Sequence, residues 1–165
     1  MSEVVLRRAQ LSDVPTLERW DQAEHVRAVS GDDGPWDWPN EIAVPWQEVW
    51  ICEVGTRPIG VVIVLDASAE PSNYWGRDSE RPCPGTYAID IWIGEIDALG
   101  CGYGTIMMKH AIARAFDAHD AHTLVIDPLA DNRRAIDFYR RLGFVEVGPR
   151  RFGTDDCLVL ELLRS

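Results

Sequence analysis

The chain has 165 residues, of which 46% are hydrophobic and 26% are charged, and its formal net charge is −11. This size and composition are typical of one soluble globular domain, so we expect a single domain over residues 1–165. An acidic surface repels phosphate backbones, and no stretch approaches the ~20 apolar residues of a membrane span, so we expect neither nucleic acid nor a membrane as partner.

Targeting and metal signals are both missing from the sequence. The N-terminal segment has no apolar stretch of the length that a signal peptide needs, which predicts a cytoplasmic protein. The cysteines are scattered, without a C-x-x-C pair and without histidines at metal-ligand spacing; they are Cys52, Cys83, Cys101 and Cys157. We therefore expect reduced thiols and no metal site.

The first half of the chain begins with a short strand pattern in which Val5 is expected to face the core. Ser12 is the expected N-cap of the helical region that follows. The elements expected here are a strand at 3–9, one or two helices at 13–29, a loop at 30–45, a strand hairpin at 48–68 turning at 55–58, and a long loop at 67–86.

The second half alternates apolar runs with helical patterns. The elements expected here are a strand at 86–96, a glycine loop, helices at 105–118 and 131–144, a buried strand at 122–128, and closing strands at 144–149 and 157–163. Gly143 ends the second helix. This order predicts a mixed α/β fold with one layer of sheet and helices on both of its faces.

The glycine loop "LGCGYGT" joins a strand to a helix. Gly100, Gly102 and Gly104 leave alternate positions bare, so that backbone N–H groups and the positive end of the helix dipole can meet an anion, most simply phosphate. A Walker loop is disfavoured because no lysine follows the glycines. A dinucleotide loop has a different glycine spacing, although Asp127 does close the next strand; a turn without a ligand is the third alternative.

Two longer stretches carry a family resemblance. The segments "LGCGYGTIMMKHAIARAF" and "LVIDPLADNRRAIDFYRRLGFVEVG" resemble the acetyl-CoA-binding half of the GNAT superfamily of N-acyltransferases. The helix motif of that family, Asn-x-x-Ala-x-x-Phe-Tyr-x-x-x-Gly-Phe, is matched by Asn132, Ala135, Phe138, Tyr139, Gly143 and Phe144. Leu99 stands where the family commonly has Gln or Arg, a small departure because main-chain N–H groups provide most of the phosphate contacts.

The resemblance implies a GNAT-type acyltransferase fold. Its central, mostly antiparallel sheet of about seven strands is splayed between strands 4 and 5 and flanked by about four helices. Residues 1–85 would form the acceptor-side half, and residues 86–163 the acetyl-CoA-binding half. We expect a monomer or a homodimer.

The resemblance also implies acetyl-CoA as co-substrate and assigns its binding residues. Main-chain groups of Ile91, Trp92 and Ile93 would pair with the pantetheine arm as a pseudo-strand. The pyrophosphate loop would be Leu99, Gly100, Cys101, Gly102, Tyr103, Gly104 and Thr105. Asn132 would hydrogen-bond the arm; the alternative is an ordinary helix cap.

In such enzymes a substrate amine attacks the thioester carbonyl and must first lose a proton. Asp90 is the leading base or ammonium anchor, because strand alternation places it opposite Ile89 and Ile91; a solvated residue is the alternative. Glu95 is the second candidate, and a water chain the third. Tyr139 matches the family's tyrosine that protonates or hydrogen-bonds the departing thiolate, although an aromatic at helical spacing is also typical of a core.

The acceptor is expected to be a small polycationic amine. Within the superfamily the sequence is most similar to aminoglycoside 6′-N-acetyltransferases. Acidic and aromatic side chains suit ammonium groups and sugar rings, and the candidates are Asp32, Asp33, Trp36, Asp37, Trp38, Asp90, Asp155 and Asp156. Each acidic run alone is also typical of a solvated loop. Other candidate functions are acylation of hydroxylysine or another siderophore precursor, acetylation of peptide N-termini, and non-catalytic binding of acyl-CoA.

Overall fold

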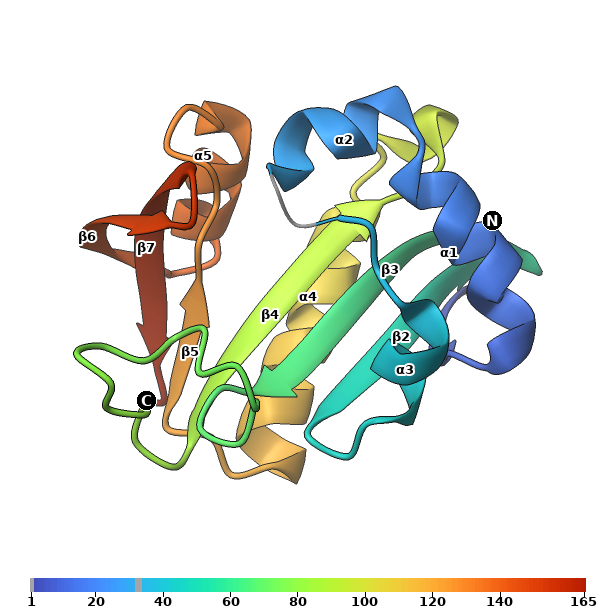
Figure 1. Cartoon of the computed structure of the whole chain (residues 1–165). Coiled ribbons are helices and arrows are strands. Elements are labelled where there is room, and N and C mark those ends of the chain that lie inside the picture. The colour runs from blue at the N-terminus through green and yellow to red at the C-terminus, as the bar shows by residue number, and fades with distance from the viewer. Residues whose placement is uncertain (1, 32–33) are drawn as a thin grey trace.

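A single seven-stranded sheet forms the centre of the molecule, with strand order β1-β2-β3-β4-β5-β7-β6 (Figure 1). The computed structural model describes residues 2–31 and 34–165. The strands are β1 (Val4–Arg8), β2 (Gln47–Val54), β3 (Arg57–Asp66), β4 (Thr86–Ile93), β5 (Thr123–Ile126), β6 (Val145–Phe152) and β7 (Asp155–Leu163). The helices are α1 (Val14–Asp21), α2 (Glu24–Ser30), α3 (Trp38–Ala43), α4 (Tyr103–Ala113, continued by a π-helical turn over Arg114–Ala118) and α5 (Arg133–Arg141).

Neighbouring strands are antiparallel everywhere except between β4 and β5, which run parallel. Their pairing covers three residues of each strand and ends at Ala88 and Val125, although β4 continues to Ile93. Beyond that point the two strands diverge in the direction of α2 and α5 (Figure 1). The expected splay between the fourth and fifth strands is therefore confirmed.

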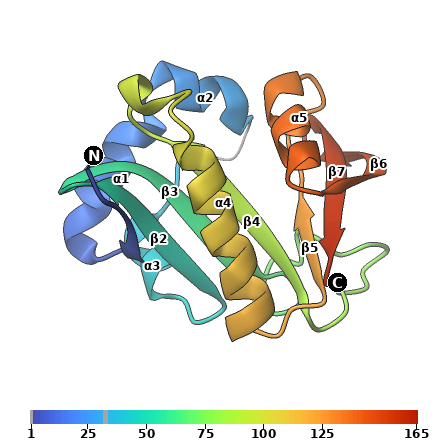
Figure 2. The same ribbon diagram turned by 180° about the vertical axis from the view of Figure 1, so that it is seen from behind.

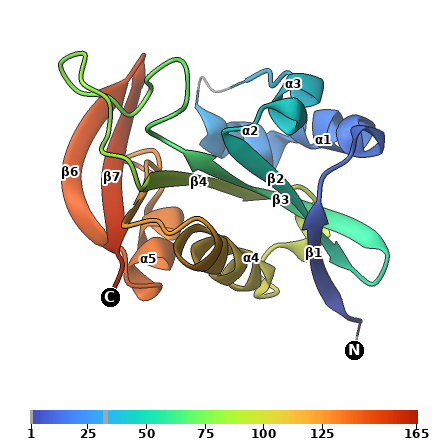
Figure 3. The ribbon, with the colours of Figure 1, turned by 90° about the horizontal axis from the view of Figure 1, so that it is seen from below.

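The two faces of the sheet bury two different cores. Strand alternation sends Val62 to the face covered by α4 and α5, where it joins Met107 of α4. Its neighbour Val61 points the other way, toward Trp20 of α1 and Trp38 of α3. Figure 3 shows α1, α2 and α3 on one side of the sheet and α4 and α5 on the other, and Figure 2 shows α4 lying along its face. Helices on both faces were expected and are confirmed.

Three local predictions were wrong. Val5 is 36% exposed, because Val4 and Leu6 face the α4 core and the alternation of this edge strand is shifted by one residue. Ser12 lies inside a 3-10 turn over Leu11–Asp13, and the Asp13 carboxylate, not the serine hydroxyl, accepts the N–H of Gln10 at 2.7 Å.

The segment 30–45 is also more ordered than a loop. It contains α3, and Trp38 at the start of this helix is completely buried. Residues 30–45 show no regular period of apolar residues from which α3 could be predicted. The helix is positioned mainly by the packing of Trp38 against the sheet.

Among the described residues, no helix is long and apolar enough to cross a membrane. The four cysteines are free thiols, two of them buried and two exposed. No group of three or more histidine, cysteine or acidic side chains in the same described part of the chain is placed to hold a metal ion.

The side chain of Glu48 in β2 forms hydrogen bonds that link the C-terminal end of α4 to the sheet. Its carboxylate accepts hydrogen bonds from Arg114 at 2.6 and 3.1 Å, and from Arg8 and Trp50 at 3.2 Å. Burial alone would raise the pKa of Glu48, but the bonds from Arg114 and Trp50 and the nearby His119 ring outweigh burial and lower the pKa from 4.5 to about 2. The orientation of α4 thus depends on an ionised side chain.

We predict that Glu48→Gln lowers the free energy of unfolding at pH 7 by about 2 kcal/mol, the contribution of hydrogen bonds to a charged group. Because the pKa of Glu48 is depressed in the folded state, this stabilisation is present above pH 4.5 and is lost as the pH falls toward 2. Denaturant unfolding at pH 7 and pH 3 measures the effect. The difference between wild type and variant should shrink at the lower pH, and a difference that does not change with pH would contradict this account.

Candidate active site

A cavity of about 530 Å³ lies where β4 and β5 separate. Its lining comes from α2, the exposed end of β4, the glycine loop, the first turn of α4, α5 and the start of β7. Segments far apart in the sequence therefore meet where β4 and β5 leave the sheet open.

The glycine loop forms one end of this cavity. Gly100 and Gly102 have φ angles of 72° and 85°, and a Cβ atom built on either would project into open space. The helix α4 begins directly afterwards, and Gly102 provides no side chain to cap it. The N–H groups of its first turn lack intrahelical acceptors and lie beside the cavity, which suits a phosphate group.

Not every residue of the loop contributes in the same way. Leu99, Tyr103, Gly104 and Thr105 also line the cavity. The exposed thiol of Cys101 instead lies 3.8 and 3.6 Å from the carbonyl oxygens of residues 97 and 99. Cys101 is not among the residues that line the cavity.

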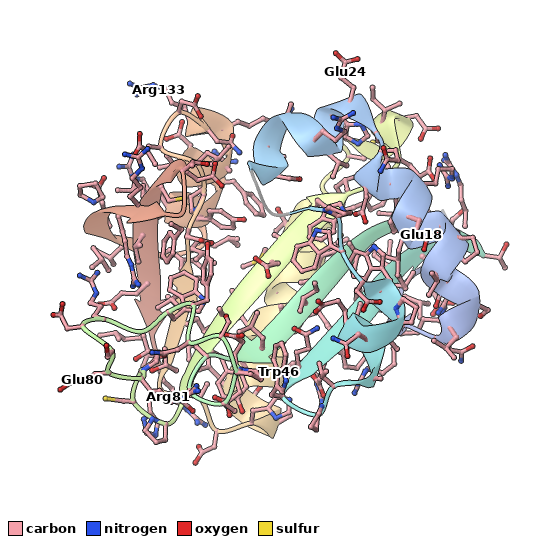
Figure 4. The ribbon with its side chains drawn as sticks, in the orientation of Figure 1. Glu18, Glu24, Trp46, Glu80, Arg81 and Arg133 are labelled. Carbon is pink, nitrogen blue, oxygen red and sulfur yellow. The ribbon has the colours of Figure 1, made fainter. Side chains whose placement is uncertain are left out.

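Two arginines that sequence reasoning did not select, Arg134 and Arg141 of α5, line the same cavity. They are seven positions apart and so lie on one face of the helix. Arg133, by contrast, projects outward from α5 (Figure 4). The available signal was a pair of arginines at helical spacing in a chain with a net charge of −11.

The exposed edge of β4 offers main-chain groups to a ligand. Gly94 N donates to Ile59 O at 2.8 Å, and Ala67 N donates to Thr86 O at 2.9 Å, so even-numbered residues of β4 direct their main-chain groups to β3. The main-chain groups of Ile91 and Ile93 face the gap, and those of Trp92 face β3. Trp92 therefore does not provide the expected main-chain contact. The imidazole of His25 already hydrogen-bonds Ile93 O at 2.9 Å.

Two carboxylates, Asp90 and Asp127, lie just beyond the point where β4 and β5 separate. The last paired residues of the two parallel strands, Ala88 and Val125, both belong to the core beneath α1–α3. Asp90 lies two positions further along β4, so alternation places it on that same face, and Asp127 lies two positions beyond Val125, directly after the end of β5. Both line the cavity. Sequence reasoning used Asp127 only in the dinucleotide alternative, because its place in the same cavity as Asp90 depends on strand pairing.

Tyr139 of α5 is 8% exposed and lines the cavity. Burial, followed by the negative charges of Asp90 and Asp127, raises the pKa of its phenol far above the ordinary value. The phenol therefore stays protonated at neutral pH and can donate a proton or a hydrogen bond.

Asn132 precedes α5 and accepts the N–H of Ala135 on its Oδ1 at 3.2 Å. It is thus a helix cap, as the alternative interpretation expected, and it also lines the cavity. Its Nδ2 group is a donor that a ligand carbonyl can accept from.

Glu95, the second candidate base, is committed to a structural role outside this cavity. Its carboxylate accepts hydrogen bonds from Arg19 at 2.5 Å and from Trp20 Nε1 at 2.9 Å. The bond from Arg19 lowers the pKa of Glu95. The indole of Trp20 also fills the space above Gly94, where a Cβ would clash with the ring.

The two expected aromatic residues have different positions: Trp36 lines the cavity, and Trp38 is buried behind it. Trp36 lines the cavity and stacks on Trp38 with ring centroids 5.4 Å apart. Trp38 is fully buried and donates its Nε1–H to Asp21 at 2.7 Å, so it supports Trp36 from below. Trp92 also lines the cavity, 5.6 Å from Trp36.

The expected acidic residues divide in the same way. Asp155, at the start of β7, lines the cavity and lies against Gly31 at the end of α2. Asp156 points the other way and is exposed beside Arg151, and Asp37 is exposed at the start of α3; neither lines the cavity. Asp32 and Asp33 lie outside the described residues.

Comparison with known proteins agrees with this geometry. The sequence profile of the acetyltransferase (GNAT) domain matches residues 9–152. Aminoglycoside N(6′)-acetyltransferase type 1 of Klebsiella pneumoniae is 25% identical over 132 residues, which are 80% of this chain and 64% of that protein; the Serratia marcescens protein gives the same values. The chain thus spans less than two thirds of the length of these relatives.

Solved structures show the same fold. Aminoglycoside acetyltransferase AAC(6′)-Ib in complex with coenzyme A superposes with a TM-score of 0.83 at 23% identity, covering 98% of this chain and 95% of that one. The aminoglycoside N(6′)-acetyltransferase of Legionella pneumophila superposes with a TM-score of 0.71 at 17% identity, over 99% and 93% of the two chains. With most of its length matched by the domain profile and with this fold, the chain belongs to the GNAT acetyltransferase family, in which acetyl-CoA is the acyl donor.

Proposed function

We propose that this protein transfers the acetyl group of acetyl-CoA to a primary amine of a small polycationic acceptor, the 6′-amine of an aminoglycoside. The observation that carries the proposal is the lining of one cavity by three carboxylates and by aromatic rings beside the phosphate-binding loop. The carboxylates are Asp90, Asp127 and Asp155, and the rings include Trp36, Tyr74 and Trp92.

The donor end of the cavity suits acetyl-CoA. The uncapped first turn of α4 and the bare positions at Gly100 and Gly102 offer N–H groups to its pyrophosphate. Arg134 and Arg141 add positive charge on the opposite wall. The outward main-chain groups of Ile91 suit an extended amide arm, which would pair with β4 as an added strand.

Acetyl-CoA supplies an activated acetyl thioester, and the chain supplies proton transfer and positioning. Asp90 holds the acceptor ammonium beside the splay and takes its proton, directly or through water, so that the neutral amine can attack. Tyr139, kept protonated by its surroundings, donates to the sulfur as the carbon–sulfur bond breaks.

The acceptor end suits a ring with several ammonium groups. Three like charges in one cavity attract a polycation more strongly than a monoamine, and the indole of Trp36 provides an apolar face for a sugar. The overall charge of −11 steers such a molecule toward the protein.

We predict that Gly102→Val abolishes acetyl-CoA binding, because its side chain enters the space of the pyrophosphate at a φ of 85°. Gly55→Val is the matched control: it imposes similar strain, at a φ of 64°, in the β2–β3 turn. Leu99→Ala should change the affinity little. Calorimetric titration with acetyl-CoA measures all three, and unchanged affinity in a folded Gly102→Val protein would contradict the assignment.

We predict that Asp90→Asn lowers turnover by ~10²-fold and leaves acetyl-CoA affinity nearly unchanged, because the amide keeps the shape but neither holds nor deprotonates an ammonium. Tyr139→Phe should give a smaller loss. Steady-state kinetics with each substrate varied in turn separates these effects. Wild-type turnover in Asp90→Asn would assign deprotonation to water alone.

We predict that Asp155→Asn raises the acceptor KM and spares the acetyl-CoA KM, whereas its exposed neighbour Asp156→Asn changes neither. The assay is thiol release with a panel of aminoglycosides, polyamines, hydroxylysine and short peptides. Added salt should raise the acceptor KM of the wild type as well. Turnover of only a peptide or a hydroxylysine derivative would overturn the aminoglycoside assignment and retain the acetyltransferase activity.

A further inference from the structure

The loop 67–85, between β3 and β4, is docked on the β6–β7 hairpin rather than extended into solvent (Figure 1). Arg150 of β6 donates to the carbonyl oxygens of three consecutive loop residues, Tyr74 and Trp75 at 3.3 Å and Gly76 at 2.5 Å. Its guanidinium also lies 4.5 Å from the ring centre of Phe152. One arginine thus fixes the middle of the loop.

Tyr74 extends from this docked segment to the cavity. Its ring stacks on Phe152, with centroids 4.5 Å apart and planes 6° from parallel. Its hydroxyl donates to Asp127 Oδ2 at 2.6 Å, and both side chains line the cavity. A short hydrogen bond to an ionised carboxylate fixes the direction of its oxygens.

The hydrogen bond from Tyr74 matters because Asp127 lies in the same cavity as Asp90. Asp90 and Asp127 each lie two positions beyond the last paired residues of β4 and β5 and line the same cavity, so an acceptor that places one amine at Asp90 has a second carboxylate within that cavity. A carboxylate free to rotate would pay an ordering cost on binding a cation, whereas Tyr74 has already oriented this one.

We propose that Tyr74 is a positioning residue that holds Asp127 as the anchor for a second ammonium group of the acceptor, so that the loop 67–85 selects diamino sugars over monoamino sugars. This inference rests on the proposed function and adds the part of the acceptor that is recognised away from the reacting amine. It makes the specificity of the site depend on Arg150 and Phe152, which lie behind the cavity wall.

The experiment compares two acceptors that differ in one amine, 6-amino-6-deoxyglucose and 2,6-diamino-2,6-dideoxyglucose, with acetyl-CoA. Tyr74→Phe keeps the ring stacked on Phe152 and removes only the hydroxyl. We expect the KM of the diamino sugar to rise about tenfold, the loss of one hydrogen bond to a charged group, while the KM values of the monoamino sugar and acetyl-CoA stay unchanged. Asp127→Asn should give at least the same rise, and the double variant should be no worse than Asp127→Asn alone.

Glu80→Gln, at the exposed outer edge of the same loop, is the matched control and should change none of these values (Figure 4). Equal losses for both sugars in Tyr74→Phe, or additive losses in the double variant, would overturn the inference. A wild type that acetylates both sugars equally well would overturn it too, and the proposed function would stand. A wild type that acetylates no amine in the panel would overturn the proposed function and this inference with it.

Discussion

The early end of the pairing between β4 and β5 is the constraint on which the site depends. Parallel neighbours normally continue side by side, and an unpaired edge inside a sheet leaves main-chain groups without partners. Here the ladder stops at Ala88 and Val125, so that β4 presents the main-chain groups of Ile91 to a gap instead of to a strand, while Ile93 O is hydrogen-bonded to the His25 ring. An extended amide ligand can complete the hydrogen bonding of that edge. The same divergence lets α5 bring Tyr139 to the cavity and separates Asp90 from Asp127. In the proposed reaction, cofactor binding, proton transfer and acceptor binding therefore all depend on this divergence of the two strands.

Charge is segregated along the cavity in a way that net charge alone does not reveal. The N-terminus of α4 and two arginines of α5 make the donor end positive, although the whole chain carries −11. Carboxylates from β4, the end of β5 and the start of β7 make the acceptor end negative. All of these carboxylates lie in residues 86–163, the half expected to bind acetyl-CoA, whereas the first half contributes Trp36, Tyr74 and the helix α2. In the proposed reaction each substrate thus meets charge of the opposite sign, which disfavours its binding at the other substrate's end of the cavity.

Sequence reasoning succeeded where the signal is local. The glycine loop before α4 and the Asn132-to-Phe144 motif around α5 are continuous in the sequence, so the family, the number of strands and the splay could be predicted from the resemblance that they carry. It failed where tertiary contacts decide. The sequence alone does not distinguish Trp36 from Trp38. In the structure, Trp38 is hydrogen-bonded to Asp21 and packed against the sheet, and Trp36 stacks on it and lines the cavity. Asp155 and Asp156 differ only by strand alternation once β7 begins at Asp155. The pairing of Asp127 with Tyr74 joins residues 53 positions apart and had no sequence signal at all.

In the proposed reaction, the carboxylates that line the cavity distinguish acceptors by their charge. Asp90, Asp127 and Asp155 bring like charges together, and the first two also raise the pKa of Tyr139, so their field is felt within the site. In the proposed reaction a polycation meets three carboxylates in this cavity as it binds, whereas a neutral molecule of the same shape gains nothing from their charge. In that proposal, discrimination among acceptors depends on charge as well as on shape.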